Sequence, residues 1–74
     1  MLPLDDKWAA YLLAQPETGM GYQVVSITTT DGKVYPQVIV DSGFVTSVRG
    51  YEAIPFSIDQ IREIQVNHEK WEEP

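Results

Sequence analysis

Few residues of this chain have the type and spacing that catalysis requires. His68 is the only histidine, and a histidine acts as a general base only where the fold holds it against a nucleophile or a carboxylate. Its neighbour Glu69 would point to the opposite side of an extended strand. We therefore expect His68 to be a solvated residue at a strand end, and we expect the protein not to be an enzyme.

The carboxylates could in principle bind a metal or hydrolyse a substrate. Glu63 and the acidic residues of the tail 68–74 do not converge on one point, as a divalent cation would require. Asp31 and Asp41 sit in predicted turns at opposite ends of one strand, about 20 Å apart at the usual strand rise, which is too far for paired-carboxylate hydrolysis. The chain has no cysteine, which excludes disulfides and thiolate zinc sites. We expect no metal and no cofactor.

Two further patterns carry no chemistry in their context. Gly19 and Gly21 have the G-x-G spacing of a phosphate-binding loop, but such a loop follows a strand and opens a helix. The predicted order here is the reverse, so we interpret residues 16–21 as a connector. The serine and threonine hydroxyls stand on no nucleophile elbow and next to no base, and we assign them to strand propensity and capping.

Length and charge restrict the remaining function classes. The 74 residues make one domain, 1–74. Its core is small, so we expect the fold to need additional stabilisation, for example from oligomerisation. The net charge is −6 and the five lysines and arginines are scattered, whereas nucleic acids and anionic membranes require clustered basic groups. No apolar run could span a bilayer, and the N-terminus has acids where a signal peptide needs basic residues. We expect a cytoplasmic protein.

The first element that must position any site is a helix predicted at about residues 5–15. Asp5 or Asp6 can cap its start, where a negative charge is also favourable for the helix dipole. Pro16 disfavours helix at the residue before it and ends the segment. The apolar residues fall on one face: Leu4, Trp8, Tyr11 and Leu12. So short a helix must lie on an apolar surface to persist.

A β-hairpin is predicted next, because residues 22–29 alternate and lead to Asp31-Gly32, a strong signal for a two-residue turn. The inward pairs are then Thr29–Val34, Ile27–Pro36, Val25–Val38 and Gln23–Val40, and the outward pairs are Thr28–Tyr35, Ser26–Gln37, Val24–Ile39 and Tyr22–Asp41. Pro36 cannot donate a ladder hydrogen bond, so it requires a bulge or an unpaired position.

The rest of the chain predicts two more strands and a turn after the second hairpin. A three-residue loop ending in a left-handed Gly43 would turn Phe44 inward, whereas a two-residue loop would turn it outward, and we favour the longer loop. Residues 51–56 read as a short fourth strand, and Ser57 with Gln60 as the capping pattern of one helical turn before a fifth strand. The expected core is Val25, Ile27, Val38, Val40, Phe44, Val48, Ile54, Phe56, Ile61, Ile64 and Val66.

These elements predict a mainly β fold, with strands at about residues 22–67. The stretches DGKVYPQVIVDSGFVTSV and IPFSIDQIREIQV resemble the meander and the closing segment of small five-stranded SH3-like and Sm-like barrels. The fold would carry an N-terminal α-helix and one short helical turn before the last strand. The second stretch also resembles the end of PRC-barrel domains, in which a hydrophobic-Pro-Phe strand precedes a short turn and a final strand.

The resemblance does not bring a known activity with it. Sm-like proteins begin with a short helix and form RNA-binding rings, but here no basic or asparagine-rich loop follows Asp41 and the charge is acidic. SH3 domains bind proline-rich peptides through an aromatic groove and an acidic first loop, and this chain has no recognisable version of that loop. Neither RNA binding nor peptide binding therefore transfers.

The outward face of the first hairpin is the best candidate for a contact surface. It carries four apolar or aromatic residues: Tyr22, Val24, Tyr35 and Ile39. Either the N-terminal helix covers this face through Trp8, Tyr11 and Leu12, or the face binds a partner or a second copy, with Trp71 at its margin. We expect a non-enzymatic interaction module that self-associates or binds another protein. The alternatives are an Sm-like nucleic-acid-binding protein and a small ligand-binding protein.

Overall fold

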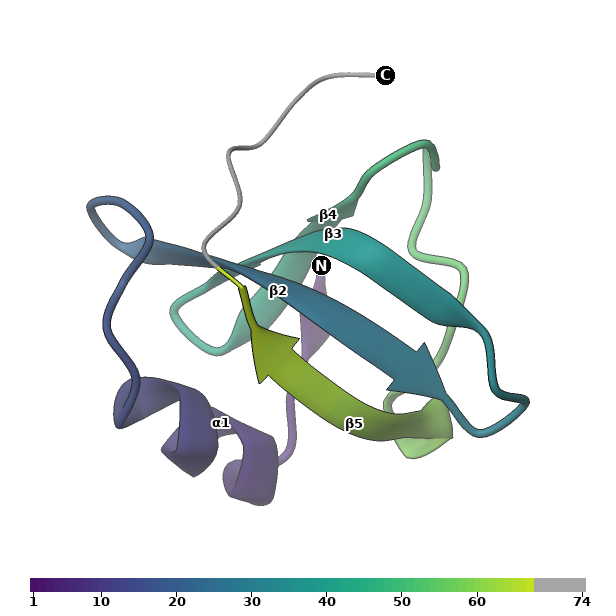
Figure 1. The fold of residues 1–74 in the computed structure, drawn as a ribbon, viewed down its shortest axis with the longest axis horizontal. Helices are drawn as coiled ribbons and strands as arrows, with labels where there is room; N and C mark the ends of the chain where they lie inside the picture. Colours follow the sequence, from purple (N-terminus) through teal and green to yellow (C-terminus); the bar gives the residue numbers. More distant parts are fainter. Residues whose placement is uncertain (68–74) are drawn as a thin grey trace.

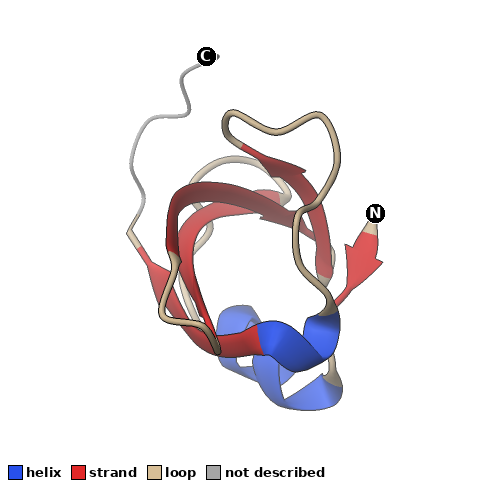
Figure 2. Ribbon diagram, turned by 90° about the vertical axis from the view of Figure 1, so that its right-hand side faces the viewer, coloured by secondary structure: helices blue, strands red, loops and turns tan. Residues whose placement is uncertain are grey.

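Five antiparallel strands curl around the core of this protein, in the spatial order β1-β4-β3-β2-β5. The computed structural model describes residues 1–67. The elements are β1 (Leu2–Pro3), α1 (Asp6–Leu13), β2 (Tyr22–Thr29), β3 (Val34–Asp41), β4 (Phe44–Val48), the 3₁₀ turn η1 (Ile58–Gln60) and β5 (Ile61–Val66). The strands form an incomplete ring with the helical segments along one side (Figures 1 and 2). The predicted mainly β class is confirmed.

Helix α1 closes the inner side of the curled sheet. It starts where the Asp5 carboxylate accepts a hydrogen bond from the Trp8 N–H at 3.1 Å, as an N-cap does. Leu12 is buried in the core cluster together with Leu4, and Trp8 packs against the same cluster. The interpretation that the helix covers the outward face of the first hairpin is therefore wrong.

No helix within residues 1–67 is long and apolar enough to cross a membrane.

The register of the first hairpin changes part-way along β3. Val25 pairs with Val38 as predicted, but Ile27 pairs with Tyr35, so Pro36 and Gln37 together oppose Ser26. This is the bulge that Pro36 requires. Because one extra residue reverses the faces of all residues beyond it, Tyr35 turns inward and is buried in the core. Its predicted outward position is wrong.

The turn of this hairpin is longer than predicted, which accounts for the extra residue. The Thr29 N–H donates to the Lys33 carbonyl at 2.9 Å, so residues 30–32 form the loop. Gly32 has a φ of 88°, the left-handed conformation typical of the last residue in such a loop. The longer loop shifts the pairing by one residue, and the bulge at Pro36 shifts it back.

The turn of the second hairpin is shorter than predicted. Asp41 pairs with Phe44, so the loop is only Ser42-Gly43, with φ angles of 53° and 84°. A serine in this conformation is uncommon, and the longer loop is expected from the sequence because it would turn Phe44 inward. With the observed two-residue loop Phe44 points outward, and its predicted place in the core is wrong. Val45, which faces the other way, is fully buried.

The predicted fourth strand at residues 51–56 is also wrong. The segment forms a single bridge between Val48 and Tyr51 and then runs as an irregular connection, in which Pro55 lacks the N–H for a ladder. Strand β1 supplies the fifth strand instead, by pairing with β4. The predicted helical turn is confirmed, because the Ser57 N–H donates to the Gln60 side chain at 2.8 Å.

Most of the predicted core is confirmed. Buried in one cluster are Leu4, Leu12, Val25, Ile27, Tyr35, Val38, Val40, Val45, Val48, Phe56, Ile61 and Ile64, with Ile54 and Val66 partly buried against it. The residues absent from the prediction come from the N-terminal segment and from the two strand stretches whose register differs.

Candidate functional site

The outward face of the first hairpin carries less exposed apolar surface than its sequence suggests. Val24 pairs with Ile39, and Val24 is fully buried while Tyr22 and Ile39 are half-buried. The Tyr22 ring lies against Gly19, where an added β-carbon would collide with it. Tyr35 belongs to the core, and Trp71, like the rest of the predicted tail 68–74, lies outside the described residues. Three of the predicted contact residues thus share a face, but it is largely covered.

An open cleft of about 660 Å³ adjoins the Tyr22 end of this face, and Tyr22 itself lines it. It is bounded by the second half of α1, residues 15–17, the start of β2, the end of β3 and the turn after it. Its apolar lining includes Ala9, Leu12, Leu13, Pro16 and Val40. A volume of this size is typical of sites that hold a ligand or a few side chains of a partner.

Gln23 positions the helix that forms one wall of this cleft. Its side-chain amide donates to the carbonyl oxygens of Leu12 at 2.9 Å, Gln15 at 3.2 Å and Pro16 at 3.2 Å. The Leu12 carbonyl lies in the last turn of α1 and also accepts from the Gln15 N–H at 3.0 Å, and the other two carbonyls belong to residues that follow the helix. Gln23 is buried, so β2 holds the end of α1 from inside the sheet. The sequence offers a signal for this role, since a lone amide on an apolar face must find partners.

Leu13 stands at the rim of the cleft with most of its surface in water. Its side chain is 88% exposed, because it occupies the last residue of α1 on the side turned away from the core. Leu12, its neighbour, is buried and lines the same cleft. The cleft therefore joins a buried apolar wall to an exposed apolar rim.

The charges around the cleft are negative. Glu17 lines it, and Asp41 adjoins it through Ser42, whose hydroxyl donates to the Asp41 carboxylate at 2.8 Å. The last turn of α1 contains no basic residue, so nothing on that turn offsets the partial negative charge of the helix end. None of the described residues that line the cleft is a lysine or an arginine.

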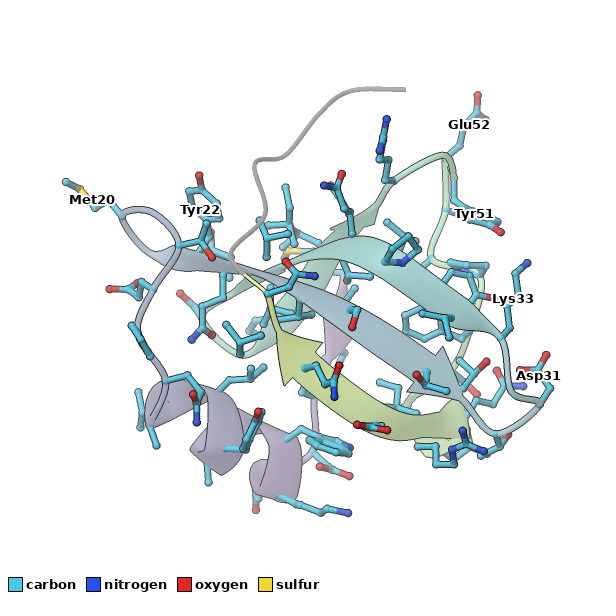
Figure 3. All side chains as sticks on the ribbon, in the orientation of Figure 1. Met20, Tyr22, Asp31, Lys33, Tyr51 and Glu52 are labelled. Carbon is cyan, nitrogen blue, oxygen red and sulfur yellow. The ribbon has the colours of Figure 1, made fainter. Side chains whose placement is uncertain are left out.

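A second cluster of polar and aromatic groups lies at the other end of the sheet. The Lys33 ammonium donates to the Tyr51 hydroxyl at 2.9 Å and stands 5.1 Å and 5.4 Å from the ring centroids of Tyr35 and Tyr51. The Tyr35 ring also packs on Phe56 at 5.1 Å. Figure 3 shows Lys33 and Tyr51 at the end of the molecule opposite to Met20 and Tyr22. These contacts fasten the first hairpin to the segment that follows β4.

The charged groups of this cluster are satisfied by their neighbours. The Tyr51 hydroxyl beside Lys33 raises the pKa of that ammonium above its usual value. Hydrogen bonds from the Thr29 hydroxyl and from the Lys33 N–H lower the pKa of the Asp31 carboxyl. Both groups are charged at neutral pH, and neither is poised to exchange a proton there. The cluster therefore serves to hold the first hairpin against the segment that follows β4.

No metal site is formed by residues 1–67, in which histidine, cysteine, aspartate and glutamate form no group of three or more that could hold an ion. His68 lies outside the described residues. Comparisons of the chain with protein-family models, with curated proteins and with solved structures find no match.

Proposed function

We propose that this protein is a non-enzymatic interaction module that binds another polypeptide through the cleft beside α1. The observation that carries the proposal is the exposed Leu13 side chain at the rim of an apolar cleft. Exposed apolar groups that adjoin a concave apolar surface are typical of sites that become buried on binding. The outward face of the first hairpin offers a partner less exposed apolar surface, because Val24 is fully buried.

We further propose that the fold belongs with the SH3-like and Sm-like barrels. The support is topological: β5 follows a 3₁₀ turn and pairs with β2, the first strand of the meander β2-β3-β4. This proposal places the protein among folds that commonly serve in binding. It assigns neither proline-rich peptides nor RNA as the partner, since a fold does not fix a function.

A comparison of two exposed apolar residues tests the proposed function. Leu13 lines the cleft, whereas Met20 is 100% exposed in the connector 16–21 and is absent from the lining. We expect Leu13→Ser to lose proteins that the immobilised wild type retains from an extract of the source cell, and Met20→Ser to retain them. Both side chains are exposed, so both variants should keep the wild-type stability to within about 0.5 kcal/mol.

Two results would contradict the proposal. One is that the wild type retains no protein above a blank support and remains a monomer in sedimentation measurements. The other is that Leu13→Ser and Met20→Ser retain the same proteins equally well, since the cleft would then contribute nothing to binding.

A further inference from the structure

We infer that the natural occupant of the cleft is a partner segment that combines large apolar side chains with lysine or arginine, and not a second copy of this chain. This inference rests on the proposed function and names the chemistry of its partner. The apolar part would fill the space beside Leu12 and Val40. The cationic part would meet the negative rim.

Helix α1 provides the first element of the negative rim. The carboxyl end of a helix carries partial negative charge, which favours cations within about one turn. In α1 this end faces the cleft, because Leu12, Leu13 and Gln15 all line it. Gln23 binds the carbonyl groups there through a neutral amide, so it satisfies hydrogen bonds without adding positive charge.

Two carboxylates provide the second element. Glu17 follows the helix and lines the cleft, and Asp41 ends β3 between the lining residues Val40 and Ser42. Both are exposed, so a partner cation can reach them without displacing the core. A segment lying in the cleft would pass near both, so a lysine or arginine on a flank of its apolar residues would meet one of the two.

The charge of the whole chain argues against a second copy in the same place. Each copy has a net charge of −6, and like charges brought together in an interface weaken association. A self-complementary contact would also bring the Glu17 and Asp41 carboxylates of two copies toward one another. A basic partner removes both penalties, and its attraction should weaken as salt screens the charges.

Designed peptides can test the inference without knowledge of the natural partner. The probe is an amphipathic peptide of leucine and lysine of about 14 residues, roughly four helical turns, and its counterpart has glutamate at every lysine position. The measurement is a titration of the ¹⁵N-labelled protein followed by amide chemical shifts. We expect the leucine–lysine peptide to shift the amides of Leu13, Gly21 and Gly43 and the glutamate peptide to bind at least about 10-fold more weakly.

A matched pair of double variants separates the cleft from the overall charge. Glu17→Gln with Asp41→Asn should weaken the leucine–lysine peptide about 3- to 10-fold at low ionic strength. The control pair, Glu52→Gln with Glu63→Gln, changes the net charge by the same amount. Both residues lie far from the cleft: Glu52 is at the end of the molecule that carries Lys33 (Figure 3), and Glu63 pairs with Thr28 near that end. The second pair should weaken binding less than about twofold.

Each outcome bears on one of the two proposals. Equal binding of the lysine and glutamate peptides in the cleft, or equal effects of the two double variants, would overturn the inference and leave the cleft as an interaction site. Concentration-dependent shifts at Leu13, Gly21 and Gly43 without peptide would also overturn it, because a second copy would then be the occupant. Failure of both peptides to shift the cleft amides would contradict the inference, whereas the Leu13→Ser comparison tests the proposed function separately.

Discussion

The two ends of strand β3 each carry a tight turn with an exposed aspartate, but they treat their polar groups differently. At one end the Asp31 carboxylate accepts hydrogen bonds from Thr29 and Lys33. At the other end Asp41 accepts a hydrogen bond from its neighbour Ser42, beside a cleft whose described lining has no cation. The Asp31 carboxylate thus has its partners within the protein, whereas the Asp41 carboxylate remains accessible to a cation from outside.

The apolar groups near the two turns also differ, although Val34 and Tyr51 at the Asp31 end are partly exposed. At the Asp31 end, Tyr35 and Phe56 are buried, and Tyr51 lies at 5.6 Å from the Tyr35 ring. At the Asp41 end, Leu13 remains exposed beside the cleft. Under the proposed function, the Asp31 end contributes stability and the Asp41 end contributes a surface for binding. Substitutions at the two ends should therefore change different properties.

The largest expected effect is the loss of stability when the aromatic cluster is truncated. Phe56→Ala and Tyr35→Ala should each lower the free energy of unfolding by about 3 to 5 kcal/mol, because each leaves a cavity beside the other ring. Denaturant unfolding followed by circular dichroism measures the change. Leu13→Ala is the control and should stay within about 0.5 kcal/mol of the wild type. A stable Tyr35→Ala variant would contradict the inward position of Tyr35.

An intermediate effect is expected where the cleft is attached to the sheet. Gln23→Met keeps a similar volume but removes the amide that serves Leu12, Gln15 and Pro16, so we expect a loss of about 1 to 2 kcal/mol. The loss should be accompanied by faster hydrogen exchange at the end of α1 and unchanged exchange in β3. Uniformly faster exchange throughout the sheet would show that Gln23 supports the whole fold and not the cleft wall.

The smallest effect concerns acid. Asp31 has a folded-state pKa below its ordinary value of 3.8, so its contribution to stability is present above that value and disappears as the pH falls through the folded-state pKa. The difference in melting temperature between wild type and Asp31→Asn should therefore shrink as the pH falls from about 5 to 2. Thr29→Val should shrink it too, since the Thr29 hydroxyl is the main cause of the lowered pKa. A difference that does not change with pH would contradict the role of this carboxylate.

The sequence predicted the fold where local signals and burial agree. Asp5 and Pro16 bound the helix, and the alternation of β2 gave its inward face. The sequence also required a bulge or an unpaired position at Pro36, but that requirement alone does not decide which way Tyr35 faces. The shift that turns Tyr35 inward begins in the three-residue loop 30–32, where Asp31-Gly32 predicts a two-residue turn.

The cleft could not be predicted, because its walls come from segments that are distant in sequence. Leu13 and Val40 line the same cleft, and β2 holds the helix beside it through Gln23. The predicted contact surface lost Tyr35 for a related reason, since the register change turns that residue inward, while Tyr22 keeps its place on the surface. Short pairings such as that of β1 with β4 have too few residues to show alternation.

The bulges have a consequence for tracing the ancestry of this chain. Three of the strands each contain a surplus residue relative to a neighbour: β3 at Pro36–Gln37, β4 at Thr46 and β5 at Arg62. Each amounts to a single-residue insertion inside a strand, which the fold accommodates by bending. A distant relative with straighter strands would lack these residues. Alignments that allow gaps only in turns would place half of each such strand out of phase, and the kinship would go unseen.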